Sequence, residues 1–188
     1  DIQKIISLVT KTQGLIKNRE MAAHVKEKGL ADYVTQVDIA VQNFLKKELF
    51  ALAPDIQFLG EETGLQEIKA DSFWILDPVD GTTNLMHDYQ HSVVSLALCR
   101  QGDIIMGIIY GPFRDEVFSA IKGKGSFLNG QPIHVSNAEK LSDTMIGLGT
   151  AKEKWPMKIL PGSAGCSVSA RMSAGLALPL WNWHIPPA

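Results

Sequence analysis

Apolar residues recur at helical spacing in the first part of the chain. Isoleucine, valine and leucine side chains repeat every three or four positions near the start, which predicts one helix over residues 2–27 that Gly29 ends. A second helix is expected from Thr35, which with Asp38 has the spacing of a capping box, and Pro54 stops it. The apolar face of this second helix is expected to consist of Val37, Val41, Phe44, Leu45, Leu49 and Phe50.

The middle of the chain is a succession of short apolar runs separated by turn-forming residues, which is the pattern of β-strands. Gln101-Gly102 and Asn129-Gly130 provide turns between neighbouring runs, and the Asn-Gly pair is a strong hairpin signal. Helices followed by antiparallel-style strands predict an α+β or layered α/β/α fold and not a Rossmann alternation. The expected strands cover residues 56–59, 73–76, 93–99, 104–110, 116–121, 127–128, 132–135 and 144–148.

Composition narrows the class of protein. With 188 residues, 45% of them hydrophobic, the chain can bury a real core as a single domain over residues 1–188. A net charge of −2 without a basic block argues against nucleic-acid binding. The sequence contains no apolar segment of membrane length and no signal peptide, so a cytoplasmic location is expected. Cys99 and Cys166 lack metal or redox spacing and are expected to be buried thiols.

An acidic segment follows the apolar run at residues 73–76 and is the main candidate for chemistry. It reads Asp77-Pro78-Val79-Asp80-Gly81-Thr82-Thr83-Asn84. Pro78 favours an extended conformation for Asp77, so the strand is expected to end there, whereas Gly81 lets the backbone approach a ligand closely. A helix is expected next, and the free N–H groups at its start favour an anion. Paired carboxylates beside exposed amides suit a hard cation together with a phosphate group.

Two upstream segments change the interpretation of this stretch. Taken alone it would be interpreted as a simple turn, because turns prefer Asp, Pro and Gly. However, Gly60-Glu61-Glu62 also follows an apolar run, and Asp32-Tyr33-Val34-Thr35-Gln36-Val37-Asp38 lies further upstream. In this order the three segments resemble the inositol monophosphatase family of metal-dependent phosphatases, whose signature matches residues 74–84 almost letter for letter. The resemblance covers roughly residues 20–150.

The resemblance implies a layered α/β/α/β/α sandwich of the sugar-phosphatase type. It also implies that the activity depends on Mg²⁺. Mg²⁺ prefers hard oxygen ligands in near-octahedral geometry. By resemblance, Glu61, Asp77 and the carbonyl of Val79 hold a first ion, and Asp77 and Asp80 hold a second. Two ions about 3.5–4 Å apart would clamp a phosphoryl group. An EF-hand is excluded because its Asp-x-Asx-x-Asx-Gly spacing is absent.

The resemblance also assigns catalytic and substrate-binding residues. It pairs Thr82 with Asp38 to orient the attacking water, since a hydroxyl hydrogen-bonded to a carboxylate can accept a water proton. The structural alternatives are that Asp38 is only the capping-box acid and that Thr82 is only a helix N-cap. The substrate-binding set implied by the family is Glu61, Val79, Asp80, Gly81, Thr82, Gly162, Ser163 and Ala164.

The resemblance weakens after about residue 150. Gly162-Ser163-Ala164 matches a family element, but the connection from Leu148 is shorter than expected, and the family's later Trp-Asp element is missing because no Asp or Glu follows Glu153. We therefore expect the C-terminal part to be truncated or aberrant. A natural short form with fewer metals and a form that has lost catalysis are the alternatives.

The function predicted from these residues and the resemblance is a Mg²⁺-dependent phosphomonoesterase. It would hydrolyse a small polyol or sugar phosphate, with inositol monophosphate as the leading candidate, by attack of a metal-activated water. Related phosphatases of fructose 1,6-bisphosphate or nucleotide 3′-phosphates are an alternative, and a non-catalytic metal- and phosphate-binding protein is an alternative of another class. Lithium inhibition and a homodimer are expectations that rest on the family alone.

Overall fold

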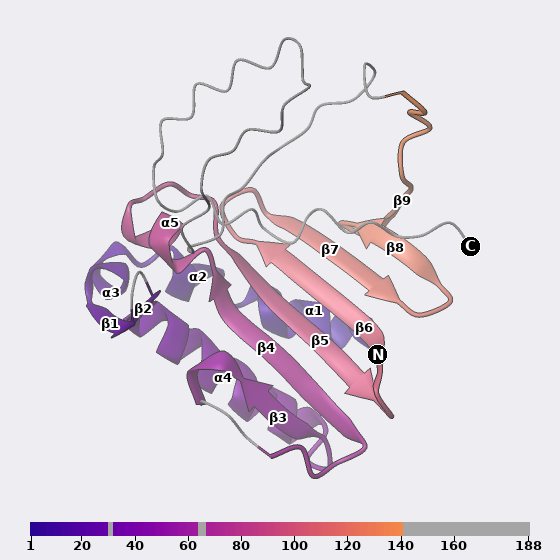
Figure 1. The fold of residues 1–188 in the computed structure, drawn as a ribbon, viewed down its shortest axis with the longest axis horizontal. Helices are drawn as coiled ribbons and strands as arrows, with labels where there is room; N and C mark the ends of the chain where they lie inside the picture. The colour runs from indigo at the N-terminus through magenta and orange to yellow at the C-terminus, as the bar shows by residue number, and fades with distance from the viewer. Residues whose placement is uncertain (30–31, 64–66, 141–188) are drawn as a thin grey trace, which may run out of the picture.

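The computed structural model describes residues 1–29, 32–63 and 67–140 (Figure 1). The first elements are α1 (Ile2–Thr10), α2 (Gln13–Ile16), α3 (Arg19–Ala23), β1 (Val25–Gly29), β2 (Asp32–Thr35) and α4 (Gln36–Leu52). The central elements are β3 (Gln57–Gly60), the 3₁₀ turn η1 (Glu61–Thr63), β4 (Ser72–Asp80) and α5 (Thr82–Met86). The last elements are β5 (Val93–Arg100), β6 (Asp103–Gly111), β7 (Glu116–Ile121), β8 (Gly125–Leu128) and β9 (Gln131–Ile133).

One sheet dominates the described part of the chain. Seven strands lie side by side in sequence order from β3 to β9, and β1 and β2 form a separate antiparallel pair. Only the β3–β4 pair of the large sheet is parallel, whereas every later pair is antiparallel. This arrangement confirms the predicted α+β class and excludes a Rossmann alternation. The strand predicted at residues 144–148 lies outside the described residues.

The predicted hairpin turns are present. Gln101 and Gly102 both have positive φ, at 52° and 83°, and so do Asn129 and Gly130, at 49° and 79°. Two consecutive residues with positive φ are what a tight two-residue hairpin requires, because that backbone twist matches the twist of the flanking strands. Both dipeptides were therefore reliable turn signals.

The single helix predicted over residues 2–27 is wrong. The chain forms three short helices there, and Asn18 begins the third by accepting a hydrogen bond from the Met21 N–H with its side chain (3.1 Å). The remaining residues form β1, in which Val25 pairs with Thr35. Helical spacing of apolar residues continued past α3, but pairing with β2, which begins at Asp32, determined the local structure.

Helix α4 begins and ends as its sequence predicts. Thr35 and Asp38 form the complete capping box, and the helix ends at Leu52, before Pro54. The expected apolar face is buried at four positions and partly buried at Phe44, but Phe50 is 63% exposed. Phe50 was a wrong assignment, because it directly follows Leu49 and one helical step of 100° turns it away from the core. The fully buried positions are Val37, Val41, Leu45 and Leu49.

The core lies between the sheet and the helices on one of its faces. Figure 1 shows α1, α2 and α4 stacked against the same face of the sheet. Their apolar side chains pack against alternate residues of the central strands, such as Leu96 on β5 and Ile108 on β6. This packing places the first turn of α4 near the end of β4, where the acidic segment begins.

Two smaller predictions concern cysteine and membranes. Cys99 is buried and not disulfide-bonded, as expected, and Cys166 lies outside the described residues. None of the helices in residues 1–29, 32–63 and 67–140 has the length and apolar character that a membrane span needs.

Candidate functional site

The end of β4 carries the acidic segment, and it differs from the prediction. The strand does not end at Asp77 but continues to Asp80, which pairs with Val93 of β5. Asp77 pairs with Ser95, so two residues of β4 lie opposite one residue of β5 and the register shifts between the two acids. Proline has no N–H for the ladder and is tolerated at such irregularities. The extra residue shifts the alternation of side chains between Asp77 and Asp80, so two residues three positions apart can project toward the same face.

Gly81 turns the chain from β4 into α5. Its φ is +89°, and a Cβ at this position would lie 2.9 Å from the carbonyl oxygen of His91. The Ser92 hydroxyl donates to the Gly81 carbonyl (2.9 Å), and the Asn84 side-chain amide donates to the His91 carbonyl (2.8 Å). Gly81 is the N-cap of α5, so Thr82 is the first residue of the helix and not its N-cap. These contacts hold the turn against the start of β5.

Glu61, Asp77 and Asp80 come together from two separate segments. Burial is the main cause that raises the pKa of Asp77 to about 8, and repulsion from Glu61 and Asp80 raises it further. In its protonated form the Asp77 carboxyl donates a hydrogen bond to Glu61, while the Val79 N–H donates to Asp77 Oδ1 (3.1 Å). The side chain of Glu61 is exposed, so the group of acids is reached from solvent. Three carboxylates within mutual electrostatic range are unfavourable unless a proton or a cation neutralises them.

Asp80 shares this environment. Burial and then the charge of Glu61 raise its pKa, and the Gly81 N–H and His91 partly offset the rise. Among the residues that the structure describes, no group of three or more His, Cys, Asp or Glu side chains is arranged to hold a metal ion as it stands. The chemistry of the donor set nevertheless fits a hard divalent cation, because carboxylates that repel one another gain most from its charge.

Asp38 and Thr82 meet beside the acids. The Thr82 hydroxyl lies 3.1 Å from Asp38 Oδ1 and 2.9 Å from the carbonyl oxygen of Val79. Asp38 is only 2% exposed, and burial raises its pKa, although hydrogen bonds from Thr35 and Thr82 act in the opposite direction. The pair predicted to orient water is therefore in contact, and Val79, a predicted metal ligand through its carbonyl, is part of the same cluster.

Three polar residues of this site were not predicted. Ser92 and Asn84 hold the Gly81 turn, and Gln42, which is 4% exposed, accepts a hydrogen bond from the Glu62 N–H (3.0 Å). The one signal for Gln42 is its position four residues after Asp38, because a polar residue at that spacing interrupts the apolar face of α4. The predicted residues Gly162, Ser163 and Ala164 lie outside the described residues.

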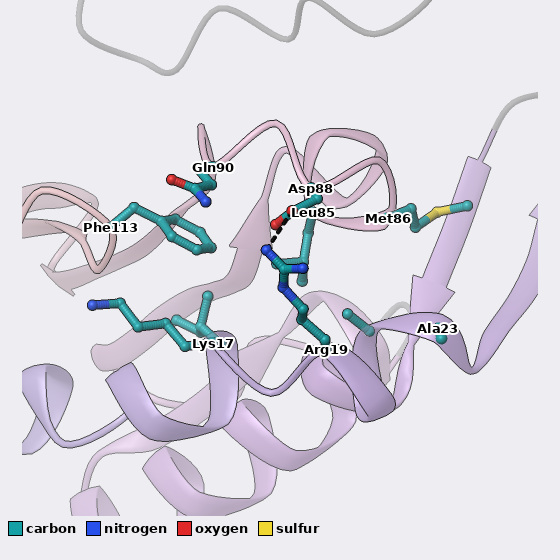
Figure 2. Close-up of a pocket in the computed structure, with 10 residues that line it drawn as sticks. Lys17, Arg19, Ala23, Leu85, Met86, Asp88, Gln90 and Phe113 are labelled. Atoms are coloured by element: carbon teal, nitrogen blue, oxygen red, sulfur yellow. Dashed lines mark hydrogen bonds and ion pairs between the residues drawn. The ribbon is translucent and has the colours of Figure 1, made fainter.

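A separate cavity lies between the first helices and α5. Its volume is about 450 Å³, and none of Glu61, Asp77 and Asp80 lines it. Figure 2 shows Arg19 facing Asp88 at its edge, where the two form an ion pair of 2.5 Å. The Arg19 side chain is largely exposed and that of Asp88 is half-exposed, so the pair adds little stability. The cavity is therefore distinct from the acidic site.

Comparison with known proteins identifies the family. The model of the inositol monophosphatase family matches residues 2–155, and the chain belongs to this family. It is 43% identical over 129 residues to an inositol-1-monophosphatase of Rhizobium meliloti, covering 67% of this chain and 48% of that one. It is 36% identical over 167 residues to inositol monophosphatase 3 of Solanum lycopersicum, covering 84% and 62%. The chain therefore spans about half to three fifths of these relatives.

Other relatives are known by further names and ligands. The Nus factor SuhB of Xylella fastidiosa is 38% identical over 132 residues, covering 70% of this chain and 48% of that one. The extragenic suppressor protein suhB of Bartonella henselae superposes with a TM-score of 0.69 at 34% identity, covering 74% and 56%. An IMPase/NADP phosphatase solved with Mg²⁺ and phosphate superposes with a TM-score of 0.64 at 29% identity, covering 70% and 51%. A staphylococcal inositol monophosphatase in a lithium-soaked inhibitory complex has a TM-score of 0.68 at 28% identity, covering 74% and 55%. These structures share the fold of the described residues.

Proposed function

We propose that this chain is a Mg²⁺-dependent phosphomonoesterase that hydrolyses a small polyol or sugar phosphate, with inositol monophosphate as the leading candidate. One observation carries the proposal: Asp77 is a buried acid within electrostatic range of Glu61 and Asp80, and burial, together with repulsion from those two acids, raises its pKa to about 8. A stable protein has no structural use for such repulsion, and strongly shifted pKa values gather at functional sites. Membership of the inositol monophosphatase family supports the same conclusion.

The carboxylates of Glu61, Asp77 and Asp80, with the carbonyl of Val79, are the groups that would hold Mg²⁺. Mg²⁺, when bound, supplies the positive charge that favours attack of water on phosphorus and stabilises the leaving oxygen. The Val79 N–H donates to Asp77 Oδ1, which orients that carboxylate. The phosphatase relative solved with Mg²⁺ and phosphate supports this assignment of the cofactor.

Thr82 and Asp38 would orient the attacking water. The buried Asp38 accepts a hydrogen bond from the Thr82 hydroxyl, so that hydroxyl could take a proton from the attacking water while it passes its own proton to the Asp38 carboxylate. Gly81 and Thr82 would bring backbone N–H groups to the phosphate oxygens, and we extend the phosphate site to Gly162, Ser163 and Ala164. The roles of Asp38, Gly81 and Thr82 follow from their chemistry and their place beside the three acids, whereas Gly162, Ser163 and Ala164 are assigned from the family resemblance alone.

Several classes of phosphate ester are candidates for the substrate. Fructose 1,6-bisphosphate and nucleotide phosphates remain alternatives, and one solved relative is described as an IMPase/NADP phosphatase. A panel of inositol, fructose and nucleotide phosphates, compared by kcat/KM, would separate them. A non-catalytic metal- and phosphate-binding protein is the alternative of another class, because residues 154–188 contain no Asp or Glu to complete the second metal site.

The test is phosphate release with and without Mg²⁺, by the wild-type protein and by Asp80→Asn. We expect turnover only for the wild-type protein with Mg²⁺, and lithium should inhibit it. Asp103→Asn is the matched control, because Asp103 is an exposed acid that pairs with Lys122 and lies level with the start of β4, whereas Asp77 and Asp80 lie at its end. Equal turnover in all conditions would refute the proposal of a Mg²⁺-dependent phosphatase. Mg²⁺ binding with no turnover would support the alternative of a non-catalytic binding protein.

Further expectations from composition and from the family stay predictions for this chain. These are a single domain over residues 1–188, a homodimer, a cytoplasmic location, and no nucleic-acid or membrane partner. Size-exclusion chromatography with light scattering measures the oligomeric state directly.

A further inference from the structure

Gln42 is a buried polar residue on the face of α4 that otherwise packs into the core. It is 4% exposed, and the positions before and after it on this face, such as Val41 and Leu45, are fully buried and apolar. Burying an amide is unfavourable unless it is hydrogen-bonded. Gln42 meets this requirement with its Oε1, which accepts from the Glu62 N–H at 3.0 Å. The backbone that it holds is the turn η1, which also contains Glu61.

Gly60 makes this contact possible. A Cβ at Gly60 would lie 2.2 Å from Gln42 Oε1, a distance that no real side chain tolerates. Gly60 does not have a positive φ, so glycine is needed here for space and not for conformation. The glycine before Glu61 therefore marks the place where the amide of α4 reaches the turn.

The same face of α4 also supports the other half of the site. Asp38 and Gln42 are four residues apart, so their side chains project from the same face of the helix. Asp38 contacts Thr82, and Gln42 contacts the turn that carries Glu61. One rigid helix thus fixes the position of the acidic turn relative to the hydroxyl at the start of α5.

We propose that Gln42 is a positioning residue that holds the η1 turn so that Glu61 faces Asp77 and Asp80. It acts through the Glu62 backbone and touches neither substrate nor cation. This inference rests on the proposed function, because the task of the positioned Glu61 carboxylate is to bind a divalent cation. Replacing Gln42 should weaken cation binding, as loss of a group that orients a metal ligand does.

The experiment compares Gln42→Met, Gln42→Glu and the control Gln13→Met in the full chain. Methionine keeps the volume but removes the acceptor, whereas glutamate retains an oxygen for the Glu62 N–H. Gln13 is a suitable control, because its side-chain amide also bonds a backbone group, the Pro112 carbonyl (3.0 Å), outside the acidic site. The readouts are Mn²⁺ affinity, from the electron paramagnetic resonance signal of free Mn²⁺, and thermal unfolding in EDTA.

We expect Gln42→Met to bind Mn²⁺ about 10-fold more weakly than the wild type, and Gln13→Met to bind it as the wild type does. Gln42→Glu keeps the acceptor and adds a carboxylate that also attracts the cation, so it should bind Mn²⁺ no more weakly than the wild type. A wild-type protein that binds no Mn²⁺ overturns the proposed function and this inference together. A wild-type protein that binds Mn²⁺, with Gln42→Met binding as tightly as Gln13→Met, overturns this inference alone.

A second variant tests the contact from its other side if Gln42→Met does not fold. Gly60→Ala leaves Gln42 in place but displaces its amide, and it should also weaken Mn²⁺ affinity. Gly107→Ala is the control, because a Cβ at Gly107 meets nothing within 4 Å. Equal Mn²⁺ affinity for Gly60→Ala and Gly107→Ala would overturn the positioning role.

Discussion

Thr82 Oγ1 lies 3.1 Å from Asp38 Oδ1, although the two residues are 44 positions apart. The other oxygen of Asp38 is held by the Thr35 N–H (2.8 Å) and the Thr35 hydroxyl at the start of α4. One carboxylate oxygen therefore completes the capping box while the other faces Thr82. The two interpretations of Asp38, as a helix cap and as a site residue, are compatible in this geometry.

Removing the Thr82 hydroxyl should reduce catalysis far more than stability. We expect Thr82→Ala to lower kcat by about 10²–10⁴-fold, because a positioned proton acceptor contributes that much, and Thr82→Ser to keep most of the activity. Thr83→Ala, one residue further along α5, is the matched control. Steady-state phosphate release at saturating Mg²⁺ measures the effect, and equal kcat values for the two alanine variants would contradict it.

Gly81 should tolerate no side chain. Gly81→Ala combines the cost of positive φ with a contact of 2.9 Å to the His91 carbonyl, and we expect it to lower the free energy of unfolding by about 2–4 kcal/mol. Gly102→Ala measures the cost of positive φ alone, because Gly102 has a φ of +83° and a Cβ there would meet no atom within 4 Å. It should lose about 1–2 kcal/mol. Urea denaturation of both variants measures the two losses of unfolding free energy. Equal losses for Gly81→Ala and Gly102→Ala would contradict the prediction.

How far the fold could be predicted depended on whether its causes are local. The start of α4 was predictable, because Thr35 and Asp38 interact with each other across three positions. The break after α3 was not, because β1 is defined by pairing with β2, as in the register of Val25 with Thr35. Apolar spacing alone cannot report a pairing partner.

The site divides in the same way. Asp77 and Asp80 were recognisable from a strand end and a motif, but Gln42 and Ser92 act on backbone groups 20 and 11 residues away. The register shift at Pro78 also depends on the neighbouring strand β5. Residues whose role depends on contacts between distant segments can be recognised only once the positions of the sheet and α4 are known.

Leu45 should contribute strongly to stability and Phe50 hardly at all. Leu45 is fully buried against the sheet, so Leu45→Ala is expected to cost about 2–5 kcal/mol of unfolding free energy. Phe50 is 63% exposed, and Phe50→Ala should change stability by no more than about 0.5 kcal/mol. Chemical denaturation of both variants measures these changes. A large loss of unfolding free energy for Phe50→Ala would show that Phe50 belongs to the buried face of α4, as the sequence predicted.

The raised pKa of Asp77 predicts how stability depends on pH when no cation is present. Burial, and then Glu61 and Asp80, raise this pKa from 3.8 to about 8 in the folded protein. Between these values the folded chain retains a proton that the unfolded chain releases, so the free energy of unfolding falls as the pH rises from about 4 to 8. Asp77→Asn removes this titration. In EDTA the free energy of unfolding of this variant, relative to that of the wild type, should therefore increase as the pH rises from about 4 to 8.

Divalent cations should reverse the trend for the wild-type protein. Cation binding requires ionised carboxylates, so with saturating Mg²⁺ the stability of the wild type should rise with pH, and Asp77→Asn should gain little from Mg²⁺. Urea denaturation at pH 5, 6, 7 and 8, with EDTA or with Mg²⁺, measures both effects. Asp103→Asn is the control, because this exposed acid pairs with Lys122 and should follow the wild type in every condition. If the wild type and Asp77→Asn show the same pH slope in EDTA, burial and the neighbouring acids do not raise the pKa of Asp77 as the structure indicates.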